Sequence, residues 1–482
     1  MMNRATILSL AVLCFSFLSV TLSVQETLWE KYMADAEKAY RQADYAEAEQ
    51  LYLAVLKETE RFEDGDTRRA TTLNNLAELH REQGHYVQAE PFYRQALEVW
   101  EKALGREHPN FARGLNNLAG LYFHQGRFGE AEELYQQTLE IWKAALGPEH
   151  PDVATGSNNL ASVYREQGQY AQAERLYRQA LTILEQTLGP GHPRVAATLS
   201  NLANVYSSQG QYGQAESFQL RGLDLKKKAL GPEHPEVATS LNDLAALYAS
   251  QGRYSEAEPL YRQALAIREK VLGRDHPNVA QSLNNLAELY RDQDQNVQPE
   301  PLYRRALSIL ERSLGPEHPN IASVLNNLAT LYSAQGEYEK AKPLYERALG
   351  IWKKALGPEH PEVASVLNNL AKLHGAQGDY AEAESLYLRA LNLRDKTLGP
   401  EHPETVHILA NLAQLYVDRG KYVEAEIHYR RLLSLAEKTL GLGHPDVATG
   451  LKNYSDLLRT TNRDAEAERL EERARAIRSQ EN

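Results

Sequence analysis

The residues of this sequence that could do chemistry recur at one fixed spacing. Histidine followed by proline occurs every 42 residues, at His108, His150, His192, His234, His276, His318, His360, His402 and His444. A zinc site needs several ligand nitrogens within about 2.1 Å of one point, whereas neighbouring packed repeats hold equivalent residues roughly 10 Å apart. The spacing therefore favours a role for His-Pro in starting and packing each repeat, and we expect no metal site.

A glutamate also recurs once per repeat, beside an alanine. The column consists of Glu132, Glu174, Glu216, Glu258, Glu300, Glu384 and Glu426. We expect these carboxylates in the first turn of a helix, solvated and favoured by the helix dipole. The sequence has no Walker loop, nucleophile elbow or His-Glu-x-x-His motif. We therefore expect no catalytic residue and no cofactor.

Asparagine forms the most informative column. It runs through Asn75, Asn117, Asn159, Asn201, Asp243, Asn285, Asn327, Asn369, Asn411 and Asn453. Asparagine is a mediocre helix former, so its recurrence in mid-helix needs a reason. Its carboxamide offers both a donor and an acceptor, which suits pairing with a peptide unit of any sequence. A structural role in bridging adjacent helices is the alternative, for which the preceding column suits better: Asn74, Asn116, Asn158, Asn242, Asn284, Asn326 and Asn368.

The elements that position these columns are pairs of helices. The first half of one unit has apolar residues at helical spacing, namely Val279, Leu283, Leu286, Ala287 and Tyr290. The second half of the preceding unit does the same with Ala257, Leu260, Tyr261, Ala264, Ile267 and Val271. Gly252 supplies the tight turn between the halves, Gly273 ends the second helix and Pro277 starts the next one. The sequence therefore predicts an all-α fold.

This pattern resembles the tetratricopeptide repeat, through Leu283, Leu286, Ala287 and Tyr290 in the first helix and Ala257, Tyr261 and Ala264 in the second. A WD40 propeller or a HEAT or armadillo array has a similar period, but this combination of small and aromatic positions does not suit them. The 42-residue unit is longer than the usual unit of about 34 residues. In this it is similar to the repeats of kinesin light chains and their bacterial relatives. The resemblance implies a right-handed superhelical solenoid of about eleven antiparallel helix pairs.

The resemblance also implies a binding surface. Asparagine at the matching position of kinesin light chain and O-GlcNAc transferase repeats contacts the backbone of a bound peptide, on a concave groove lined by first helices. The expected peptide-binding residues are Asn75, Asn117, Asn159, Asn201, Asn285, Asn327, Asn369 and Asn411. Other groove positions vary and lack the Lys and Arg cluster that clamps a terminal carboxylate. The expected partners are extended peptide segments or other proteins.

The chain ends and two breaks complete the expected organisation. Arg4 precedes an apolar stretch, so residues 1–24 read as a signal peptide, or residues 5–24 as a membrane anchor. An atypical first repeat (28–66), regular repeats (67–445) and a C-terminal capping repeat (446–480) form a solenoid over 25–482. Weakened positions at 212–222 and 294–301 predict looser stacking, with a flexible joint near residue 296.

These features favour one function over two others. The net charge of −12 and pI near 5.8 argue against nucleic acid as a partner. We expect a non-catalytic protein- or peptide-binding scaffold that is exported, periplasmic or secreted, and that touches a membrane only through an uncleaved N-terminal segment. The alternatives are a structural self-assembling element and a regulatory arm of a separately encoded enzyme.

Overall fold

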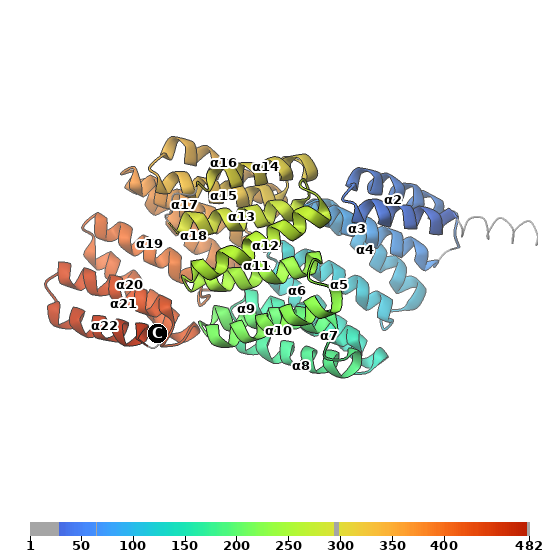
Figure 1. The fold of residues 1–482 in the computed structure, drawn as a ribbon, viewed down its shortest axis with the longest axis horizontal. Helices are drawn as coiled ribbons and strands as arrows, with labels where there is room; N and C mark the ends of the chain where they lie inside the picture. The colour runs from blue at the N-terminus through green and yellow to red at the C-terminus, as the bar shows by residue number, and fades with distance from the viewer. Residues whose placement is uncertain (1–27, 64, 294–297, 480–482) are drawn as a thin grey trace, which may run out of the picture. The chain divides into compact units, whose positions relative to one another are not determined.

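The computed structural model describes residues 28–63, 65–293 and 298–479, and within these ranges the chain folds into helices joined by turns, without a strand. Figure 1 shows the helices lying in antiparallel pairs. The order of helices in these ranges gives about eleven pairs, which confirms the predicted fold. The helices are 28–41, α2 (Tyr45–Thr59), α3 (Thr67–Glu82), α4 (Tyr86–Leu104), α5 (Pro109–His124), α6 (Phe128–Leu146), α7 (Pro151–Glu166), α8 (Tyr170–Leu188), α9 (Pro193–Ser208), α10 (Tyr212–Leu230), α11 (Pro235–Ser250), α12 (Tyr254–Leu272), α13 (Pro277–Asp292), α14 (Glu300–Leu314), α15 (Pro319–Ala334), α16 (Tyr338–Ala355), α17 (Pro361–Ala376), α18 (Tyr380–Thr397), α19 (Thr405–Asp418), α20 (Tyr422–Thr439), α21 (Pro445–Thr460) and α22 (Asp464–Arg478).

The chain divides into two compact units, residues 1–121 and 122–482. Unit 1 contains the helix at 28–41, α2 to α4 and most of α5, and unit 2 contains α6 to α22. In unit 2 the odd-numbered helices from α7 to α19 touch one another in succession. We call the face that they form the first-helix surface. None of the described helices is long and apolar enough to cross a membrane.

Most linker histidines start a helix by capping it, although before α19 the N-cap residue is Glu404. His150 has an extended backbone, and its Nδ1 accepts a hydrogen bond from the Asp152 N–H at 3.2 Å. Pro151 then occupies the first helical position, where the missing N–H costs little. The same bond occurs at the other linkers, for example from Asn278 N to His276 Nδ1 at 3.1 Å. The linker motif is thus a structural device, as the spacing predicted.

The core combines small alanines on second helices with larger buried residues of both helices. Ala173, Ala215 and Ala257 are fully buried, and so is Tyr177. Small side chains at these positions let neighbouring helices approach closely. Close-packed protein interiors tolerate little change in side-chain volume. The weak stretch at 212–222 is nevertheless part of an unbroken helix, α10, in which buried Gln219 takes the place of the tyrosine of other repeats.

Three expectations concern segments that lie outside the described residues. The signal peptide or anchor falls at residues 1–24, and the centre of the proposed joint falls at residues 294–297.

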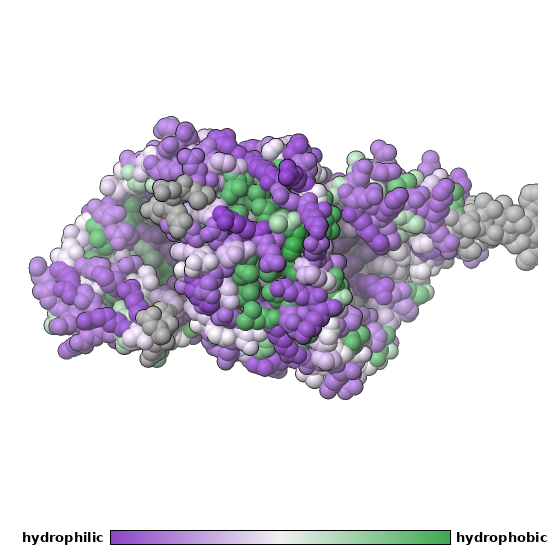
Figure 2. All heavy atoms as spheres, viewed as in Figure 1, coloured by the Kyte–Doolittle hydropathy of each residue, from purple (hydrophilic) through white to green (hydrophobic). Residues whose placement is uncertain are grey.

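In the view of Figure 2, hydrophobic residues gather around α11 to α14 in unit 2, while hydrophilic residues cover most of the rest of the visible face.

Candidate functional site

The two asparagine columns form one ladder between successive first helices. In each rung the Nδ2 of an asparagine of the predicted binding column donates to the Oδ1 of the preceding-column asparagine one repeat earlier. The rungs are Asn117 to Asn74 at 2.9 Å in unit 1, and Asn327 to Asn284 at 3.1 Å, Asn369 to Asn326 at 3.0 Å and Asn411 to Asn368 at 3.0 Å in unit 2.

The ladder changes how the binding column is interpreted. A rung uses one of the two N–H donors of the carboxamide, so Asn117, Asn327, Asn369 and Asn411 serve to join repeats. The side chain of Asn75 forms a hydrogen bond with the phenol of Tyr52, and Asn159 also has an interaction partner within the protein. Six of the eight predicted residues therefore have a partner within the protein, and the two roles that the sequence assigned to separate columns are mixed.

The ladder is interrupted in the middle of unit 2. Asn158 turns away to donate to Thr198 Oγ1 at 3.0 Å, and Asn242 to donate to Ser282 Oγ at 3.2 Å. The buried Oδ1 atoms of both residues accept no hydrogen bond from the described part of the chain. Asn201 and Asn285 lie one repeat further on, where they would otherwise complete the rungs. Their carboxamides have no hydrogen-bond partner among residues 28–63, 65–293 and 298–479.

Asp243 lies between these two free asparagines in the column. Burial raises the pKa of its carboxyl group to about 6, although the nearby cations Lys226 and Arg268 act in the opposite direction. A carboxylate can only accept hydrogen bonds, whereas the asparagine of other repeats can also donate. The middle of the first-helix surface thus differs chemically from its two ends.

The two cations come from second helices and lie beneath the first-helix surface. Arg268 is 3% exposed and donates from Nη1 to Asn278 O at 2.9 Å and to Ser282 Oγ at 2.9 Å. Lys226 is 4% exposed, and its Nζ lies 3.3 Å from Glu236 Oε2. Neither cation was predicted from the sequence. The signal in the sequence was a column of residues spaced 42 apart, in which cations replace the Trp or Leu of other repeats. The column consists of Trp100, Trp142, Leu184, Lys226, Arg268, Leu310, Trp352 and Arg394.

A cavity of about 300 Å³ opens on the first-helix surface beside Asn285. Most of its walls come from α13 and α15, and Leu310 of α14 also lines it. The lining residues are Pro277, Asn278, Gln281, Asn284, Asn285, Leu310, Asn320, Ser323 and Val324. Amide and hydroxyl groups thus surround a space with some apolar lining, which suits a peptide backbone carrying a small apolar side chain.

A second hollow, of about 450 Å³, lies between α14 and α16, which are both second helices. Leu307, Leu328 and Leu344 contribute to it, and the ion pair between Arg347 and Glu311 at 2.7 Å borders it. It contains no member of the asparagine columns. It therefore offers little that would pair with a peptide backbone.

The residues of the glutamate column are partly exposed to solvent, but they also have a structural role that was not predicted. A tyrosine at the end of the next first helix donates to most of these carboxylates. Examples are Tyr206 to Glu174 at 2.6 Å, Tyr248 to Glu216 at 2.8 Å, Tyr290 to Glu258 at 2.9 Å and Tyr416 to Glu384 at 2.9 Å. The signal was in the sequence, because a tyrosine follows each of these glutamates by 32 residues, except Glu426, where the distance to Tyr454 is 28 residues.

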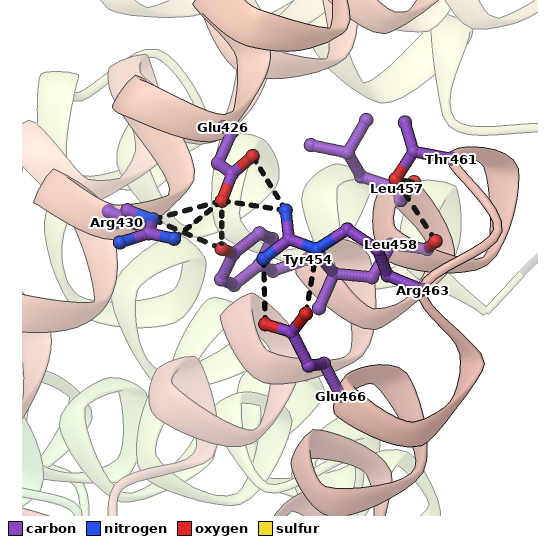
Figure 3. A network of polar contacts seen from close by, with 8 residues as sticks. All are labelled: Glu426, Arg430, Tyr454, Leu457, Leu458, Thr461, Arg463 and Glu466. Atoms are coloured by element: carbon purple, nitrogen blue, oxygen red, sulfur yellow. Dashed lines mark hydrogen bonds and ion pairs between the residues drawn. The ribbon is translucent and has the colours of Figure 1, made fainter.

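The last member of this column, Glu426, has hydrogen bonds to three side chains, which Figure 3 shows. Glu426 Oε1 accepts from Tyr454 OH at 2.7 Å and from Arg430 Nη2 at 2.6 Å. Arg463 donates to both Glu426 oxygens at 3.0 and 2.9 Å and also binds Glu466. Partial desolvation acts to raise the pKa of Glu426, but these hydrogen bonds outweigh it and lower the pKa to about 2. The network joins α20 to both helices of the last repeat.

Within the parts of the chain that the structure describes, no group of three or more histidine, cysteine, aspartate or glutamate side chains is placed to hold a metal ion.

Comparison with known proteins identifies the repeat. The sequence matches the family described as tetratricopeptide repeat over residues 69–110, and again over 110–186, 152–228, 194–270, 236–298, 279–354, 334–396, 362–438 and 408–480. No curated protein matched the chain.

Three solved structures are similar to parts of the chain. A putative kinesin light chain from Podosopora anserina is 31% identical, with 43% of this chain and 97% of that chain covered and a TM-score of 0.37. BtubC (BKLC) from P. vanneervenii is 26% identical over 51% of this chain and 92% of its own, with a TM-score of 0.38. A Rap protein complexed with Competence and Sporulation Factor is 16% identical over 77% of this chain and 98% of its own, with a TM-score of 0.52. At that identity the last comparison concerns the fold alone.

Proposed function

Because the chain belongs to the tetratricopeptide repeat family, we propose that it is a non-catalytic scaffold that binds an extended peptide segment of a partner protein. Repeat proteins of this family generally mediate protein–protein binding and are usually non-catalytic. The proposed binding site is the middle of the first-helix surface, from α9 to α15, where the predicted concave groove would lie.

The single observation that supports this site is the interruption of the asparagine ladder. Asn201 and Asn285 keep all their donors and acceptors free, and Asn285 borders the 300 Å³ cavity. A free carboxamide on a half-buried surface gains most when a ligand supplies both a donor and an acceptor. A peptide backbone does so at every residue, whereas the asparagines within the ladder have already used a donor.

The test compares free asparagines with ladder asparagines. Peptides that bind the full chain are first selected from a random peptide library. Their affinity is then measured for the double variant Asn201→Ala and Asn285→Ala and for the control double variant Asn327→Ala and Asn369→Ala. Each lost hydrogen bond should weaken binding roughly fivefold in the first variant, at about 1 kcal/mol per bond. The control should keep its affinity, and equal losses in both variants would argue against the site.

We also propose that the protein works outside the cytoplasm, on the sequence of residues 1–24 alone. N-terminal sequencing of the protein purified from its own cells tests this. A mature chain that begins near residue 25 supports export with cleavage, and an intact N-terminus on protein from the cytoplasmic fraction contradicts it.

A further inference from the structure

Unit 2 contains contacts between repeats that are far apart in the sequence. His402 Nε2 lies 2.8 Å from the backbone oxygen of Glu166, 236 residues away. Repeat proteins are ordinarily held together by contacts between neighbouring repeats alone. This hydrogen bond instead joins the end of α7 to the linker before α19.

The contact recurs in three successive repeats with the same register. At each place a turn glycine lies so close to a histidine-proline linker 234 residues later that a Cβ atom would crowd it. The shortest distances from such a Cβ are 2.7 Å at Gly126 to Pro361 Cδ, 2.8 Å at Gly168 to Pro403 Cδ and 3.0 Å at Gly210 to His444 Cδ2. We call this row of contacts the seam.

The seam joins opposite edges of the row of repeats. The turns within helix pairs lie at one end of the helices, and the linkers between pairs lie at the other end. A contact between turn and linker therefore means that unit 2 curves until one edge meets the other. Gly252, Gly336, Gly378 and Gly420 occupy the same turn position, and a Cβ on any of them would meet nothing within 4 Å.

The linker histidine is chemically suited to this second contact. Nδ1 of His402 accepts from the Glu404 N–H at 3.2 Å, so the ring proton of the neutral tautomer lies on Nε2. Nε2 then donates to the Glu166 carbonyl oxygen across the seam. Burial lowers the pKa of His360 to about 4, with a hydrogen bond at the His124 backbone acting against it, so this ring is also neutral at neutral pH.

Charge at the seam partly opposes these attractions. Three acids meet there, because Glu166 and Glu404 interact electrostatically with Glu362, and burial raises the pKa of Glu362. Arg394 offsets them, since it forms an ion pair with Glu404 and lies within range of Glu362. Hydrogen bonding and packing thus favour the contact, while repulsion among carboxylates disfavours it.

From this balance we propose that the seam is a reversible clasp, which closes unit 2 on itself and whose release lets the repeats spread apart. The clasp fixes the curvature of the first-helix surface when it is closed. A molecule that binds one curvature better than the other would shift the equilibrium between the two forms. The inference concerns the shape of unit 2 and holds whether or not a peptide binds there.

The test measures the distance between two spin labels on the full chain. Cysteines replace Ala171 and Arg389, which are exposed on α8 and α18, and serine replaces Cys14, the one native cysteine. In the seam variant, Gly168→Asn and Gly210→Asn place a side chain in the contact. The control, Gly252→Asn and Gly420→Asn, has the same positive φ, which is between 68° and 72° at all four glycines, but no neighbour to displace.

The clasp predicts one short, narrow distance in the parent protein and in the control, and a longer, broader distribution in the seam variant. A further variant, Glu166→Gln, removes one of the repelling charges and should keep the short, narrow distance, and a longer or broader distribution would contradict the proposed role of repulsion. A seam variant that matches its control would overturn the proposal. So would a parent protein whose labels already lie as far apart as in the seam variant. Equal helicity by circular dichroism shows that both glycine variants fold.

Discussion

The carboxylate of Glu426, at the end of the glutamate column, gives the sharpest prediction about stability. Glu426 receives hydrogen bonds from Tyr454, Arg430 and Arg463, and its pKa is lowered to about 2 from an ordinary value of 4.5 (Figure 3). Replacing Glu426 by glutamine keeps the shape and one acceptor but removes the charge. The last repeat, α21 and α22, should then open more easily, because Glu426 joins it to α20.

The magnitude follows from the two pKa values. A fall from 4.5 to about 2 corresponds to at most about 3.4 kcal/mol. Solvent screens charges at a site that is 24% exposed, so we expect about 1 to 2 kcal/mol. A carboxyl group with a lowered pKa in the folded state stabilises it fully above the unfolded value. That contribution is lost as the pH falls from about 4.5 towards 2.

Hydrogen exchange of the amides in α21 and α22 measures this local opening free energy. At neutral pH the Glu426→Gln protein should exchange roughly five- to thirtyfold faster than the parent protein in these helices. The difference should shrink below pH 4.5 and vanish near pH 2, where Glu426 itself is protonated. A difference that stays constant over this range would refute the electrostatic explanation.

Two further predictions concern buried hydrogen bonds. Asn369→Ala removes the rung to Asn326 and should destabilise the protein by about 1 kcal/mol in urea unfolding; no change would mean that the rung contributes nothing. The hydroxyl of Tyr303 is buried without a partner among the described residues, so Tyr303→Phe should stabilise the protein by up to about 1 kcal/mol. The matched change Tyr177→Phe loses the 2.8 Å bond to Ser162 and should destabilise it by about 1 kcal/mol, and equal effects at both tyrosines would contradict this reasoning.

The helix pairs could be predicted because their causes are local and repeated. Gly252 and Pro277 mark where helices end and start, and the structure has α11, α12 and α13 bounded at these positions. The spacing of His276 also predicted its role at a helix start, which the hydrogen bond from Asn278 N to its Nδ1 confirms. Such features depend on residues within one or two turns of each other.

The relations between repeats were harder to predict. The structural role of the Glu258 carboxylate was not predicted because its partner, Tyr290, lies in the next repeat. The asparagine columns were treated as separate, although Asn327 and Asn284 bond to each other across repeats. A ladder of this kind depends on the offset between stacked helices, which the pattern of one repeat does not contain.

The seam was the feature that the sequence was least able to predict. Gly168 and Gly252 are equivalent in the repeat, yet only the first meets a linker. The difference comes from the curvature that many repeats accumulate. Lys226 and Arg268 were missed for another reason, because a cation in place of Trp or Leu is visible only when the second-helix columns are aligned.

The central claim is that the middle of the first-helix surface binds a peptide, and photo-crosslinking tests it most directly. A peptide selected on the full chain carries a photoreactive group, and mass spectrometry identifies the residues to which it becomes attached. We expect attachment on α9, α11, α13 and α15, near Asn201, Asn285 and the cavity that Ser323 lines. Attachment mainly on second helices, such as the hollow between α14 and α16, would contradict it.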